Sequence, residues 1–208
     1  MTLLDLLSDG QVYEMLLVTR TNVTPVGVVK REKALSFKLF GGRSAEELVK
    51  WPHAALQATN DVGLIVRLAL NIPLDSELPF EESGPYRWIK GLPGVYGDVG
   101  CTRKAHSDSL GTTEILSCSL FPKADIPGLL PPRPFSRADC ALVEMAIDFT
   151  RLGIAVNSPP DEAKRLFSKI KKNYALFSRL GGKDKMGRKI MERALEIASK
   201  LGLTEELE

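Results

Sequence analysis

The stretch Ala34-Leu-Ser-Phe-Lys-Leu-Phe-Gly-Gly-Arg-Ser44 changes its periodicity at a pair of glycines. Its first half alternates apolar and polar side chains, which predicts a strand with one buried face and one polar face. The two glycines then break the strand. Ser44 and Glu47 have the spacing of a capping box, so we expect a helix that begins at Ser44.

Other short apolar segments occur on both sides of this stretch, separated by turn residues. They predict further strands at 12–19, 26–30, 55–60, 64–70, 95–103 and 112–121. A series of short strands at such turn-rich spacing is typical of a closed or nearly closed antiparallel barrel. We therefore expect a barrel domain over residues 1–126.

The C-terminal part of the chain has helical periodicity instead. After a proline-rich stretch, Ser136 and Ser158 are both suited to cap a helix, and Gly181-Gly182 is suited to end one. A last helix is predicted by apolar residues at helical spacing from Met186 to Leu201. The expected fold class is therefore α+β, with an N-terminal antiparallel β-barrel and a C-terminal helical hairpin over residues 135–208.

The composition is that of an ordinary globular protein. Of the 208 residues, 44% are hydrophobic and 26% are charged, which excludes a disordered chain or a rod. Cys101, Cys118 and Cys140 are odd in number and widely spaced, so we expect a reducing compartment and no disulfide framework. Because His53 and His106 are the only histidines, we expect no metal site. The sequence shows neither a signal peptide nor a membrane-spanning run, so we expect a cytoplasmic protein.

Charge is unevenly distributed along the chain. The formal net charge is +2, but residues 164–189 hold ten Lys or Arg residues and a single acid, Asp184. A segment of this kind can bind a polyanion, although basic helical faces are most often simply solvated. We therefore keep nucleic acid or an acidic protein as an alternative partner and rank it below a small ligand.

The segment Phe40–Leu48 is the most informative for chemistry. A strand end, two glycines and a helix N-terminus together favour an anion, and Lys38, Arg43 and Ser44 could contact a phosphate directly. An ordinary strand–turn–helix junction explains the same residues, and spacing alone favours that explanation. The sequence carries no catalytic triad motif, Walker loop or Gly-x-Gly-x-x-Gly.

Two further polar features are weaker candidates. The segment Gln57-Ala-Thr-Asn-Asp61 places polar side chains at a predicted strand end, where they suit a polar ligand or an ordinary turn. Arg151 lies in the last turn of a predicted helix, where its charge complements the helix dipole. We identify no catalytic acid or base.

Five segments, in their order and spacing, resemble a family of unknown function that is found largely in archaea, domain of unknown function 447. They are Tyr13–Arg20, Pro25–Val29, Lys38–Ser44, Ala58–Asp61 and Phe135–Leu152. That family is similar to the flavin-reductase-like, FMN-binding split barrels and has a helical C-terminal extension. The resemblance implies a split β-barrel and a homodimer with FMN at the subunit interface.

The resemblance also implies roles for individual residues. Pro25, Val26 and Gly27 would lie against the isoalloxazine ring of FMN. The remaining cofactor contacts would come from Lys38, Gly42, Arg43, Ser44, Thr59, Asn60 and Arg151. Compared with the family pattern, Gly42 replaces a serine and Glu47 replaces an asparagine, which removes a hydroxyl and adds an acid near the phosphate.

These observations lead to three expectations about function. The first is an FMN-binding flavoprotein, which as an enzyme would be an oxidoreductase with FMN as hydride carrier and NADH or NADPH as donor. The second is a flavin carrier without catalysis. The third is a module with a vestigial groove, whose basic helix binds nucleic acid or a protein.

Overall fold

The computed structural model describes residues 3–108, 111–129, 137–155 and 160–203. The chain divides into two compact units. The first, the barrel unit, comprises residues 1–60, 74–106 and 112–132, and the second, the helical unit, comprises residues 61–73, 107–111 and 133–208. The helical unit therefore takes residues 61–73 in addition to the C-terminal part of the chain.

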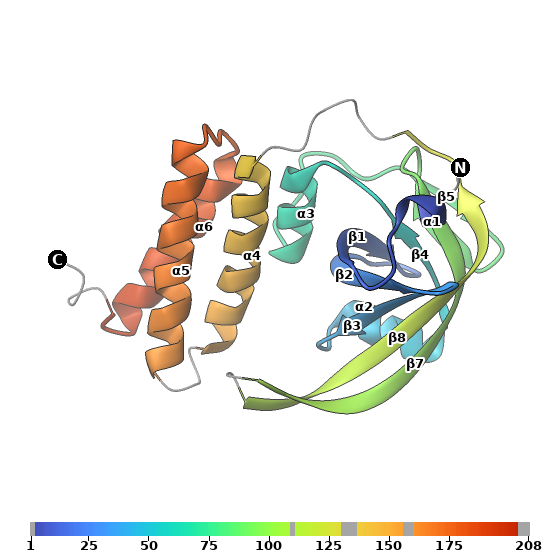
Figure 1. Cartoon of the computed structure of the whole chain (residues 1–208), viewed down its shortest axis with the longest axis horizontal. Helices are drawn as coiled ribbons and strands as arrows, with labels where there is room; N and C mark the ends of the chain where they lie inside the picture. The colour runs from blue at the N-terminus through green and yellow to red at the C-terminus, as the bar shows by residue number, and fades with distance from the viewer. Residues whose placement is uncertain (1–2, 109–110, 130–136, 156–159, 204–208) are drawn as a thin grey trace. The chain divides into compact units, whose positions relative to one another are not determined.

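Six antiparallel strands close into a barrel in the order β1-β2-β3-β8-β7-β4 (Figure 1). Their bounds are Val12–Val18 (β1), Val23–Arg31 (β2), Ala34–Leu39 (β3), His53–Gln57 (β4), Gly94–Asp108 (β7) and Gly111–Ile126 (β8). Two short helices, α1 (Leu3–Leu6) and α2 (Arg43–Lys50), belong to the same unit. The expected α+β class with a barrel and C-terminal helices is confirmed.

Alternation along the strands fills the barrel interior. In β3, Leu35, Phe37 and Leu39 are all buried, while Lys38 between them is exposed. Inward-facing aliphatic side chains from the other strands join them, so the barrel has one continuous core. In β1 and β4 consecutive residues are buried, so these two strands are covered on both faces.

A separate two-stranded hairpin, β5 (Phe80–Ser83) with β6 (Tyr86–Ile89), is attached to the barrel by the buried side chain of Gln57. The Gln57 amide donates to the carbonyls of Ile89 and Leu92 at 2.9 and 2.7 Å, and its oxygen accepts from the Ile89 N–H at 2.6 Å. Because Gln57 is fully buried, these bonds satisfy groups that would otherwise be costly to desolvate.

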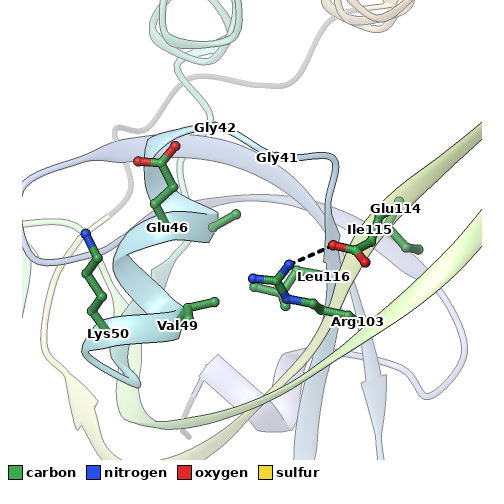
Figure 2. Close-up of a pocket in the computed structure, with 10 residues that line it drawn as sticks. Gly41, Gly42, Glu46, Val49, Lys50, Arg103, Glu114, Ile115 and Leu116 are labelled. Atoms are coloured by element: carbon green, nitrogen blue, oxygen red, sulfur yellow. Dashed lines mark hydrogen bonds and ion pairs between the residues drawn. The ribbon is translucent and has the colours of Figure 1, made fainter.

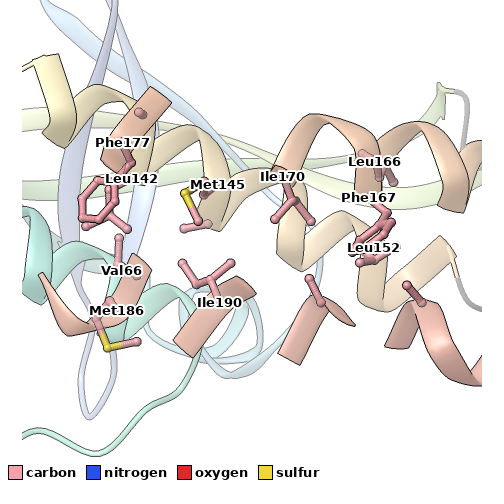
Figure 3. Close-up of a cluster of buried hydrophobic side chains, with 14 of the residues drawn as sticks. Val66, Leu142, Met145, Leu152, Leu166, Phe167, Ile170, Phe177, Met186 and Ile190 are labelled. Carbon is pink, nitrogen blue, oxygen red and sulfur yellow. The ribbon is translucent and has the colours of Figure 1, made fainter. Parts of the chain in front are cut away.

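The helical unit packs four helices around one apolar core. They are α3 (Val62–Ala69), α4 (Arg137–Ala155), α5 (Pro160–Arg179) and α6 (Lys185–Lys200). Figure 3 shows side chains of all four helices converging, among them Val66, Met145 and Ile190. The ring of Phe177 occupies space that Gly182 leaves open, since a Cβ at Gly182 would lie 2.3 Å from that ring.

The predicted strand at 64–70 is wrong, because this segment forms α3. The Asp61 side chain accepts a hydrogen bond from the Leu64 N–H at 3.0 Å and caps the helix. A short apolar run does not distinguish a strand from a buried helix, and here packing against α4 and α6 decides. The predicted caps Ser136 and Ser158 lie outside the described residues.

The sequence led us to expect no disulfide framework, but the structure contains one disulfide. Cys101 of β7 is bonded to Cys118 of β8, with Cα atoms 4.2 Å apart, and Cys140 is free and exposed. Strands β7 and β8 are neighbours in the barrel, so the two residues face each other across the pair. Their spacing of 17 residues does not reveal this, because it depends on where the hairpin turns.

Reduction of this disulfide is expected to lower the free energy of unfolding of the barrel by up to about 3 kcal/mol, because it frees a loop in the unfolded chain. Trp51 and Trp88 both lie in the barrel unit, so tryptophan fluorescence during urea unfolding reports on it. The measurement compares Cys140→Ser protein with and without reductant. Equal midpoints would show that the bond contributes nothing, and Cys101→Ala/Cys118→Ala protein should not respond to reductant.

Candidate functional site

An open groove of about 680 Å³ lies on the barrel unit, bordered by strands β1, β2, β3, β7 and β8. It is lined by Val12, Gly27, Val29, Arg31, Ser36, Phe37, Lys38, Phe40, Lys104 and Ser117. We call this the barrel groove. In the sheet register Lys38 lies opposite Ser117, and Val29 lies opposite Ser36. The barrel groove therefore depends on strands that are remote in sequence.

The barrel groove combines apolar surface with positive charge. Phe40 is 61% exposed and meets the ring of His106 edge-on, with centroids 5.5 Å apart. Arg31, Lys38 and Lys104 supply three cationic side chains. Gly27 leaves space in one wall of the groove. A Cβ at this position would lie 3.3 Å from Val12 Cγ1 and would fill part of that space. Such a surface suits a flat aromatic ligand with an anionic group.

A second pocket of about 350 Å³ lies between α2 and strands β7 and β8 (Figure 2). Ala45, Val49 and Leu116 give it apolar walls. Arg103 and Glu114 form an ion pair of 2.9 Å on the strand side, opposite the charged side chains of α2. Gly41 and Gly42 border this pocket, so the turn before α2 is accessible to a ligand.

Helix α2 begins at Arg43, and Gly42 is its N-cap with φ of 82°. This value lies in the left-handed region that glycine tolerates, and no side chain caps the helix. The first-turn N–H groups therefore remain available to an anion. Arg43, whose side chain is 65% exposed, adds a positive charge at the same place. The expected helix start at Ser44 is corrected accordingly.

The predicted capping box is absent because Glu47 bonds to the turn between β1 and β2. Thr19 Oγ1 donates to its carboxylate at 2.6 Å and the Thr21 N–H at 3.0 Å, and the Thr21 hydroxyl also donates to it. Arg43 Nε lies 3.4 Å away. Burial alone would raise the pKa of Glu47, but the bonds from Thr19 and Thr21 and the charge of Arg43 lower it.

Ser44 also forms a hydrogen bond with this turn. Its side chain is buried and accepts a hydrogen bond from Asn22 Nδ2 at 2.9 Å. Glu47 and Ser44 thus fix α2 to the turn that leads into β2. The hydroxyl of Ser44 consequently serves the contact between these elements, while the side chain of Arg43 is exposed.

The remaining predicted residues are dispersed. On β2, Gly27 lines the barrel groove, Pro25 is half-buried opposite Leu16, and Val26 points into the barrel core. Thr59 and Asn60 follow β4 and are half-buried. The structure therefore brings together only Gly27 and Lys38 in one groove, with Gly42 bordering the pocket beside α2.

Arg151 belongs to the helical unit, where its Nη2 donates to Asp108 Oδ2 at 3.0 Å. This ion pair gives Arg151 a structural partner within its own unit. Sequence reasoning missed Lys104 and Phe40 as groove residues, since no motif marks them. The available signal was the alternation itself, because the period that places Lys38 on the polar face of the strand also places Phe40 there.

A second polar cluster surrounds Asp98 on the barrel unit. Tyr86 Oη and Lys123 Nζ donate to its carboxylate at 2.7 and 2.8 Å, and His53 Nδ1 lies at 2.9 Å. The bonds from Lys123 and Tyr86 hold the pKa of Asp98 well below its usual range, while burial raises that of Tyr86. Because Tyr86 belongs to β6 and Asp98 to β7, the cluster ties the hairpin to the barrel.

Family models match two segments of the chain. Residues 13–122 match the N-terminal domain of a protein family of unknown function, DUF447, and residues 136–196 match a second model of the same family. The chain belongs to the DUF447 family. A comparison with curated proteins finds no match.

Two solved structures are similar to this DUF447 protein. The FMN-bound DUF447 protein MM1853 from Methanosarcina mazei is 21% identical, with a TM-score of 0.64 over 92% of this chain and 96% of that one. The styrene monooxygenase flavin reductase from Pseudomonas putida S12 is 12% identical, with a TM-score of 0.39 over 56% of this chain and 82% of the other. The first likeness shows that the two DUF447 proteins share a fold.

In the described part of the chain, no cluster of three or more side chains has the composition of a metal site. No helix within the same residues is long and apolar enough to cross a membrane.

Replacement of Glu47 by Gln is expected to lower the free energy of unfolding by about 1 to 3 kcal/mol at pH 7, because charge-assisted bonds to a buried carboxylate are lost. The pKa of Glu47 is lowered in the folded state, so its contribution is present above the unfolded value and is lost as pH falls. The difference between wild type and Glu47→Gln should therefore shrink below about pH 4.5.

Glu46→Gln is the matched control, since Glu46 is an exposed neighbour on α2. Urea unfolding at several pH values, followed by tryptophan fluorescence, gives both free energies. A stability difference for Glu47→Gln that is absent at pH 7, or that is the same at pH 3, would contradict the assigned hydrogen bonds.

Proposed function

We propose that this DUF447 protein binds FMN, with the isoalloxazine ring in the barrel groove and the phosphate at the start of α2. The observation that carries the proposal is the barrel groove itself. It combines an exposed aromatic ring, three cations and the space that Gly27 leaves in its wall. Its size and chemistry fit a flat ring that carries an anionic tail. A DUF447 protein with the same fold has been crystallised with FMN, which supports the choice of ligand.

The phosphate contacts follow from α2. Arg43 and the uncapped N–H groups after Gly42 offer positive charge and donors, which is the arrangement that helix N-termini use for phosphate. Ser44 is assigned a supporting role, because its hydroxyl is buried against Asn22. Glu47 does not approach the phosphate as a free charge, since Thr19 and Thr21 occupy its oxygens.

We further propose that the functional form is a homodimer that covers the barrel groove. The groove is open on one side, and large apolar side chains are exposed on its strands and next to them, namely Val12 at 63%, Phe40 at 61% and Phe121 at 56%. Exposed apolar side chains grouped in this way are typical of a protein interface. A second copy would bury them and exclude water from the ring.

As an enzyme, the protein would be an oxidoreductase with NADH or NADPH as the donor. FMN, when bound, supplies a two-electron hydride acceptor. The chain would orient the ring against β2 and shield it from water. Lys38 and Lys104 would place positive charge beside it, where it stabilises negative charge on a reduced ring.

Replacement of Arg43 by Gln is expected to weaken FMN binding by about tenfold or more, because a charge-assisted contact to phosphate is removed. Lys33→Gln is the matched control, since Lys33 is an exposed cation in the turn between β2 and β3 and lies outside both pockets. Quenching of FMN fluorescence on titration with protein gives the affinities. Equal affinities of folded Arg43→Gln and wild-type protein would overturn the phosphate site.

Gly27→Val tests the ring position separately. The new side chain would extend into the barrel groove, whereas Gly153→Val places the same residue at an exposed position of α4, where a Cβ meets nothing within 4 Å. We expect loss of FMN binding for the first variant and retention for the second. Retained binding by folded Gly27→Val would move the ring out of this groove.

A further inference from the structure

The exposed side of α5 carries a row of cations. Arg165, Lys169, Lys172 and Arg179 are all exposed and are separated by four, three and seven residues, so they lie on one face of the helix. We call these four residues the basic face. The opposite face of α5 is apolar and buried in the core of the helical unit, with Leu166 and Ile170 fully buried. Core packing therefore fixes which side of α5 meets solvent.

More cations follow in the turn after α5 and in the first turns of α6. Lys183, Lys185, Arg188 and Lys189 are all exposed. Asp184 is the only acid among residues 164–189, and its side chain caps α6 by accepting from the Met186 N–H at 2.8 Å. The segment therefore concentrates positive charge without acids interspersed along it.

Acids around the basic face neutralise only part of it. Glu162 forms an ion pair with Arg165, and the buried carboxyl of Asp148 lies near Lys169 and Arg165. Lys172 and Arg179 form no ion pair among the described residues. A solvated helix face normally alternates the two signs of charge, whereas this one keeps its like charges together at a cost in repulsion.

The chemistry of the face distinguishes among anionic partners. None of the exposed large apolar side chains of the described residues lies between 164 and 189. Protein interfaces and membrane-bound helices both need such anchors, whereas binding to a phosphate backbone needs only positive charge. Phe167 and Phe177 are buried, so they offer no platform on which unpaired bases could stack.

We propose that the basic face binds the phosphate backbone of double-stranded nucleic acid, independently of base sequence and of the flavin site. Each phosphate contact releases a counterion, so affinity must fall steeply with salt. For sequence-independent binding of this kind, the dissociation constant is expected to be about 1 to 100 µM at physiological salt. The proposal does not depend on FMN binding.

The test is fluorescence anisotropy of a labelled 20-base-pair duplex titrated with the full chain at several salt concentrations. Substitution of three cations, Lys169→Gln/Lys172→Gln/Arg179→Gln, should reduce the slope of log K against log salt by about 3. It should also weaken binding by at least tenfold at low salt. The matched control, Lys33→Gln/Lys90→Gln/Lys200→Gln, removes the same charge from exposed positions elsewhere and should leave the slope nearly unchanged.

A duplex of scrambled sequence should bind equally well. Absence of binding at low salt, or equal losses in the two triple variants, would overturn the proposal. Equal binding of poly-glutamate would also overturn it, because the face would then recognise negative charge in general. Circular dichroism of both triple variants establishes that they are folded.

Discussion

The pairing of β3 with β8 is the constraint on which the barrel and its groove depend. It joins residues about eighty positions apart in sequence, and Ser36 Oγ lies 3.1 Å from Ser119 Oγ across it. This pairing closes the barrel and sets Lys38 opposite Ser117, so one outer surface receives residues from both ends of the barrel sequence. Without closure, the groove would lose its β8 wall and the barrel core would be open to water.

A buried carboxylate then connects the groove to the proposed phosphate site. Glu47 accepts three hydrogen bonds from the turn that enters β2, which fixes the N-terminus of α2 relative to the strand that carries Gly27. A carboxylate near a phosphate is usually unfavourable. The charge of Glu47 is already satisfied by hydroxyl and amide donors and by Arg43. The carboxylate therefore fixes α2 against the turn before β2.

The sequence was sufficient for features that are local and periodic. The alternation in 34–40 predicted β3, and helical spacing predicted the three long C-terminal helices. It failed where partners are remote: Ser44 and Glu47 have the spacing of a capping box, yet both bond to the β1–β2 turn.

Residues 64–70 formed a helix because packing outweighed an ambiguous pattern. Cys101 and Cys118 faced each other only because β7 and β8 are neighbours. Groove residues such as Lys104 carry no motif.

The proposed flavin site requires that the barrel groove hold FMN within a dimer. The most direct measurement is the visible absorption spectrum of protein that has been mixed with FMN and freed of excess, recorded across a size-exclusion peak with its mass determined by light scattering. For a dimer with FMN in each groove, we expect a flavin spectrum shifted from that of free FMN, one flavin per chain, and a mass twice that of the 22.9 kDa chain. A colourless protein that does not take up added FMN would contradict a flavin site in the barrel groove.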